Sequence, residues 1–155
     1  MKNKIEFVEK HFGSLEDFVR KNPNYYLENW QSGKIKFNFA AFLFEAYWFA
    51  YRKMYFIASL LIGVNFLINI LTIYILVNTK FLGIGATLLL CIRIYIGFKA
   101  NDLYFNRAKK ILEKTNYDPK DEECGTSLLG VIIAIFTFFL IQTLIDLYLH
   151  RVLNI

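Results

Sequence analysis

The chain has 155 residues, of which 56% are hydrophobic and 18% aromatic, and its formal net charge is +5. The apolar residues are gathered into long runs, which argues against one small soluble domain built on an aromatic core. The net charge needs no nucleic-acid partner, because a basic protein face lying against anionic lipid explains it.

Residues 1–36 are polar and charged, and they predict a cytoplasmic cap of three short helices. Pro23 separates the second helix from the third, and Gly33 ends the third. A segment of this length is too small to hold a core of its own. We therefore expect its aromatic side chains to pack on the next helix or on the inner loop.

Residues 37–53 predict an aromatic helix that lies in or just under the inner membrane interface. The apolar run from Phe39 to Tyr51 is too short to cross a hydrocarbon core about 30 Å thick. Trp and Tyr prefer the headgroup level, and the basic pair Arg52 and Lys53 suits the cytoplasmic side of that level.

Three later runs have the length and composition of transmembrane helices. Met54–Val77 contains no formally charged residue, whereas Phe81–Phe98 and Ser127–Leu149 contain one each. The sequence therefore predicts an all-α integral membrane protein, with the cap and the interfacial helix preceding three spans. The spans are expected at residues 54–77, 82–98 and 127–149.

Residues 99–126, between the second and third spans, predict an amphipathic cytoplasmic helix and then an acidic loop. Basic residues alternate with Leu103, Ala108 and Ile111 at helical spacing. The acidic residues of the loop lack the ligand spacing and central glycine of an EF-hand, so a solvated loop is favoured over a calcium site.

Basic residues predict the orientation of the chain, because they accumulate on the cytoplasmic side of a membrane. Nine Lys or Arg residues precede the first span, six lie in residues 99–126, and Lys80 and Arg151 fall on the opposite side. We therefore expect a bacterial inner-membrane protein with its N-terminus inside and its C-terminus outside.

Asn38, Glu45 and Arg52 are spaced by seven residues, which would place them on one line of a continuous helix. The simpler interpretation is the solvated edge of an interfacial helix. The functional alternative is a gating or substrate contact, in which the carboxylate is buried against a cation, because an unpaired acid in lipid is too costly.

Polar residues also occur within each span. Asn65 and Asn69 share a face of the first span, the second carries Arg93, and the third carries Asp146. A rise of 1.5 Å per residue places Arg93 level with Asn65 and about 12 Å deeper than Asp146. An Arg93–Asp146 salt bridge is therefore rejected, and Arg93 is expected to reach Asn65, the phosphates or Glu45. These polar residues either line a water path or hold the helices together.

Three segments resemble a bacterial family of small membrane proteins known as domain of unknown function 2628. They are NYYLENW, FNFAAFLFEAYWFAYRKMY and GFKANDLYFNRAKKI, so the resemblance covers about residues 22–111. It implies an inner-membrane protein and no activity. Glu45 and Ala46 depart from the small or proline-containing pair expected there, which marks Glu45 as particular to this chain.

No catalytic motif is present, and His11 and His150 lie at opposite ends of the chain, so we expect neither an enzyme nor a cofactor or metal. The favoured function is a membrane-anchored interaction or accessory subunit, with Trp30 and Trp48 contacting a protein partner. The alternative is an oligomeric pore or transport component with Asn65, Asn69 and Arg93 near the path. The expected partners are the lipid bilayer, anionic lipid at the cytoplasmic face, and a second protein or further copies of this chain.

Overall fold

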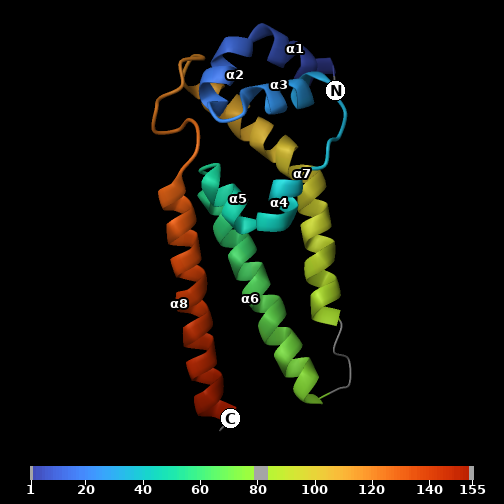
Figure 1. Ribbon diagram of the computed structural model, residues 1–155, viewed down its shortest axis with the longest axis vertical. Helices are drawn as coiled ribbons and strands as arrows, with labels where there is room; N and C mark the ends of the chain where they lie inside the picture. Colours follow the sequence, from blue (N-terminus) through green and yellow to red (C-terminus); the bar gives the residue numbers. More distant parts are fainter. Residues whose placement is uncertain (1, 79–83, 154–155) are drawn as a thin grey trace.

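A computed structural model describes residues 2–78 and 84–153, and helices account for every regular element in these ranges (Figure 1). Three of them are long and apolar enough to cross a membrane, so the predictions of an all-α chain and of three candidate spans are confirmed. Residues 82 and 83, the predicted start of the second span, lie outside the described ranges. The helices are α1 (Lys2–Lys10), α2 (Phe12–Val19), α3 (Pro23–Gln31), α4 (Phe39–Phe44), α5 (Ala46–Tyr51), α6 (Tyr55–Asn78), α7 (Ile84–Lys114) and α8 (Leu128–Leu153).

Helices α1, α2 and α3 form a cap over the far end of α7 (Figure 1). The core of this cap is supplied by α7, whose buried Tyr104 has its ring centroid 5.1 Å from that of Tyr26 and 5.8 Å from those of Phe18 and Trp30. The three short helices thus depend on the second half of α7 for their core, because they are too small to hold one of their own.

Helix α7 runs without a break from the apolar residues of the second candidate span to the cap. Its first part is apolar, whereas its second part buries Ala100, Tyr104 and Ala108 against the cap and carries charged residues on the other side. The helix of the second candidate span thus continues to Lys114. Lys4 of α1 forms an ion pair with Asp102 of α7 at 2.6 Å, which fastens the cap to this helix.

The prediction of one continuous helix over residues 37–53 is wrong. The chain bends at Glu45, whose backbone has φ 44° and ψ −114°, and two short helices, α4 and α5, meet there. A positive φ is costly for a residue other than glycine and needs tertiary support. That support comes from packing in different directions, because α4 lies on α7 whereas α5 lies on α6 and α8.

Asn38, Glu45 and Arg52 consequently do not share a helix face, and the solvated-edge interpretation fails because all three are buried. Asn38 caps α4 by accepting a hydrogen bond from the Ala41 amide at 2.9 Å. The backbone N–H of Asn38 donates to the Gly97 carbonyl at 2.7 Å, which sets the start of α4 against α7.

The long helices pack closely at a few points only. A Cβ on Gly85 of α7 would collide with Thr72 of α6, so glycine is needed there for close approach. Phe66 of α6 stacks on Phe138 of α8 with ring centroids 5.1 Å apart. Only 11% of the residues in the third candidate span, within Leu128–Tyr148, are buried, so the rest of the described chain leaves most of this helix uncovered.

Candidate functional site

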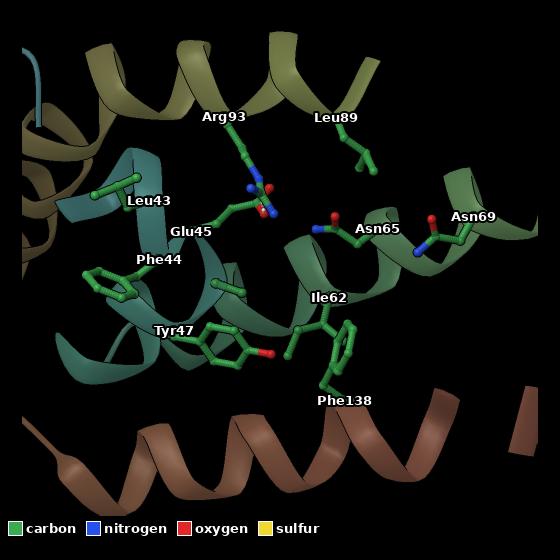
Figure 2. Close-up of a pocket in the computed structure, with 11 residues that line it drawn as sticks. Leu43, Phe44, Glu45, Tyr47, Ile62, Asn65, Asn69, Leu89, Arg93 and Phe138 are labelled. Atoms are coloured by element: carbon green, nitrogen blue, oxygen red, sulfur yellow. Dashed lines mark ion pairs between the residues drawn. The ribbon is translucent and has the colours of Figure 1, made fainter. Parts of the chain in front are cut away.

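The bend at Glu45 directs a carboxylate into the space between α6 and α7 (Figure 2). Only 6% of Glu45 is accessible, and its Oε2 lies 3.5 Å from Nε of Arg93, which reaches down from α7. The guanidinium side chain is 46% accessible, so one partner of the ion pair is buried and the other is half open. The pair connects the bend to the second long helix.

A cavity of about 240 Å³ adjoins this ion pair. Asn65 and Asn69 line it from one face of α6, because they are four residues apart on a helix (Figure 2). The Asn65 amide nitrogen donates to the Leu61 carbonyl at 2.9 Å, which leaves its Oδ1 as an acceptor for the cavity. The other lining residues are Leu43, Phe44, Glu45, Ala46, Tyr47, Ile62, Leu89, Arg93 and Phe138.

One carboxylate oxygen that borders this cavity lacks a hydrogen-bond donor in the described part of the chain. Oε1 of Glu45 is buried and has no hydrogen-bond partner among the described residues. A buried carboxylate oxygen without a partner loses its hydration and gains nothing in return. Glu45 therefore keeps one hydrogen-bond acceptor that the described residues leave unused.

Four of the residues singled out from the sequence thus meet at one place. Glu45, Asn65, Asn69 and Arg93 line the same cavity, and of the three expected directions for Arg93 the structure has the one toward Glu45. Asp146 lies elsewhere, exposed on α8, where its Oδ1 accepts from the Gln142 amide at 2.8 Å.

Arg52 and Lys53 have contacts that hold α5 to the cap and to the loop after α7. Arg52 is buried and donates to the carbonyls of Val19 and Lys21 at 3.5 and 3.1 Å. The Lys53 ammonium donates to the Glu122 carbonyl at 2.9 Å. Neither residue reaches the Glu45 cavity.

Trp30 and Trp48 were expected at a partner surface, but the structure places both in the core. Trp30 is inaccessible and its indole N–H donates to the Asn101 carbonyl at 3.1 Å, whereas Trp48 is 5% accessible. Trp30 offers no accessible surface to a partner, and Trp48 offers only the small part that lines a cavity beside Arg52. Their aromatic character reflects packing against Tyr104 and its neighbours.

Two further residues matter and were not foreseen. Tyr47 lines the cavity from α5, and no sequence pattern separates it from the other aromatic residues of that segment. Asn101 is buried, and its side-chain Nδ2 donates to the Lys36 carbonyl at 3.1 Å. Its Oδ1 accepts a hydrogen bond from the side-chain Nδ2 of Asn38 at 2.8 Å. The only hint for Asn101 was its place in the segment that resembles the family.

The described residues contain no group of three or more His, Cys, Asp or Glu side chains placed to hold a metal ion. The cavity instead offers a carboxylate, two carboxamides and a guanidinium. These groups suit a small polar organic solute better than a bare divalent cation, which prefers several oxygen ligands at short range.

Comparison with known proteins identifies a family and nothing further. The family described as protein of unknown function (DUF2628) matches residues 1–110, and neither the curated proteins nor the solved structures contain a match. The match begins about twenty residues earlier than the resemblance suggested, so it includes α1 and α2, and it ends before α8. The matched region includes α1 to α6 and α7 up to residue 110. The chain therefore belongs to the DUF2628 family.

Proposed function

We propose that the protein is a component of a membrane transport assembly in the bacterial inner membrane, with its N-terminus inside and its C-terminus outside. Its role in that assembly is to bind a small organic cation in the Glu45 cavity. The observation that carries this proposal is the buried, unpartnered Oε1 of Glu45 beside that cavity.

A primary ammonium group has the complementary chemistry. It carries three N–H donors and no acceptor, and the cavity offers the Glu45 carboxylate together with the amide side chains of Asn65 and Asn69. The cavity volume of about 240 Å³ is larger than a single metal ion needs and suits a small organic molecule.

Arg93 must move away from Glu45 before the cation binds, because two positive charges side by side repel each other. The guanidinium contacts Glu45 through one 3.5 Å approach and is half accessible, so it is free to turn outward. In the proposed cycle Arg93 neutralises Glu45 when the cavity is empty, and the ammonium group takes its place as the partner of the carboxylate.

The rest of the path must come from an assembly. Three helices alone leave little room for a lumen, and α8 buries few of its residues within the chain. Further copies of this chain or a different membrane protein would complete the walls in this proposal.

The test is the uptake of radiolabelled methylammonium by proteoliposomes that contain the purified protein. Asn69→Leu and Arg93→Leu are expected to change the initial rate severalfold, because both remove a polar group from the cavity. Thr143→Leu is the matched control, since Thr143 is exposed on α8 and its hydrogen bond among the described residues is to the Phe139 carbonyl of the same helix. Unchanged uptake in both cavity variants would contradict the proposal.

A second candidate, an accessory subunit without a transport path, is favoured by the exposed length of α8. Gentle extraction of the tagged protein from its own membrane, followed by native mass measurement and identification of co-purified proteins, separates the two. A uniform homo-oligomer supports the transport component. A stoichiometric second protein, with methylammonium uptake absent in the joint preparation, would support the accessory subunit.

A further inference from the structure

A second cavity, of about 420 Å³, lies where the cap meets α4, α5 and α8. Phe44 and Tyr47 line both cavities, so the α4–α5 bend lies between them. The polar lining of the second cavity includes Lys21 and Asn22, which connect α2 to α3, and Arg52 at the end of α5. Its apolar lining includes Ala40, Trp48, Leu128 and Val131.

Arg52 is a buried cation in this lining without an acidic partner. Its described hydrogen-bond acceptors are the carbonyls of Val19 and Lys21 and the hydroxyl of Tyr104, all of them neutral. The guanidinium also lies over the Tyr26 ring at 4.5 Å. Its Nε is buried and has no hydrogen-bond partner among the described residues. A buried charge in this state calls for an anion.

The lining adds a second positive charge, that of Lys21. Lys21 is exposed beside Arg52, and no carboxylate of the described residues lies within ion-pair distance of either side chain. The lining contains neither Asp nor Glu. An anionic group in the cavity therefore meets two cations and no carboxylate of the lining, whereas Glu16, Asp17, Asp118 and Asp121 gather in a separate pocket around Arg20 and Pro23.

The cavity lies at the depth of lipid headgroups if α8 crosses the membrane. Leu128 is the first residue of α8, and the Ser127 amide donates to the Tyr51 carbonyl at 2.8 Å, which joins the start of α8 to α5. Leu128 and Phe44 are 72% and 58% accessible, so the apolar side of the cavity continues onto the surface that lipid chains would cover.

We propose that this cavity binds one anionic phospholipid, with its phosphate at Lys21 and Arg52 and an acyl chain along Phe44, Leu128 and Val131. Basic pockets at the cytoplasmic side of membrane helices suit such headgroups. A free phosphate ion would use the two cations and leave the apolar lining without a function, which is why a lipid is the chosen occupant.

The experiment measures thermal unfolding of the full-length protein in neutral detergent against added phosphatidylglycerol, phosphatidylcholine or glycerol 3-phosphate. Phosphatidylglycerol is expected to raise the melting temperature in a saturable way, and the other two compounds are not. Lys21→Gln is expected to weaken its apparent affinity about fivefold, because one basic group near an anionic lipid contributes about 1 kcal/mol. Lys34→Gln, the same change at an exposed lysine outside the cavity, is expected to leave the affinity unchanged.

A second pair of variants tests the apolar part without altering charge. Val131→Trp fills the cavity and is expected to abolish the stabilisation by phosphatidylglycerol. Ile132→Trp, on the exposed side of α8, is expected to retain it. Equal stabilisation by phosphatidylglycerol and phosphatidylcholine, or equal affinities for Lys21→Gln and Lys34→Gln, would overturn the proposal. Stabilisation by glycerol 3-phosphate as large as that by the lipid would overturn the lipid as the occupant.

Discussion

Removal of the Glu45 charge and removal of the Arg93 charge should have unequal effects on stability. Glu45 is 6% accessible and has one unsatisfied oxygen, so Glu45→Gln relieves a buried charge and is expected to be neutral or stabilising. Arg93→Gln leaves that carboxylate without its cation. Breaking a fully buried pair costs about 3 to 5 kcal/mol, and the half-open guanidinium reduces the expected loss to about 1 to 2 kcal/mol.

The assay is thermal or denaturant unfolding in detergent of the wild type, both single variants and the double variant. The double-mutant cycle isolates the pair energy from other effects of each substitution. If Glu45→Gln cost as much stability as Arg93→Gln, Glu45 would serve to hold the fold, and the functional argument would fail. The expected asymmetry means that the chain keeps a carboxylate which its stability does not need, as proteins do at functional sites.

Three further predictions concern the packing of the chain. Trp30→Ala should destabilise the cap by about 3 to 5 kcal/mol, since the indole is fully buried, and hydrogen exchange should show α1 to α3 opening first. Gly85→Val should cost about 1 to 3 kcal/mol in unfolding experiments by forcing α6 and α7 apart, whereas Gly63→Val, which faces open space, should be silent. Burial raises the pKa of the Cys124 thiol above its usual 9.0, so in a Cys91→Ala background its alkylation below that pH should be slower in the folded than in the unfolded protein. The folded thiol keeps its proton where the unfolded thiol loses it, so the free energy of unfolding should also fall as the pH rises past that value. A Cys124 that reacts as fast in the folded as in the unfolded protein would contradict the last prediction.

The three long helices were predictable because lipid allows few alternatives. An uninterrupted apolar run of about 20 residues in a bilayer must bond its own backbone, and a helix does this. The same regular rise per residue placed Arg93 level with Asn65 and away from Asp146, and Arg93 and Asn65 do line one cavity.

The bend at Glu45 was not predictable from local sequence. Neither glycine nor proline marks it, and a glutamate with positive φ is held only by the different packing directions of α4 and α5. Seven-residue spacing therefore suggested one helix face where the chain actually turns. The burial of Trp30 was not predictable either, because composition does not tell whether an aromatic residue packs on a partner or on its own chain.

The most direct test of the central claim is equilibrium binding of radiolabelled methylammonium to the purified protein. The account predicts saturable binding to the wild type, loss of that binding in Glu45→Gln, and wild-type binding in Asp146→Asn, the same change at an exposed acid outside the cavity. Equal binding by the wild type and Glu45→Gln, or no saturable binding to the wild type, would contradict it.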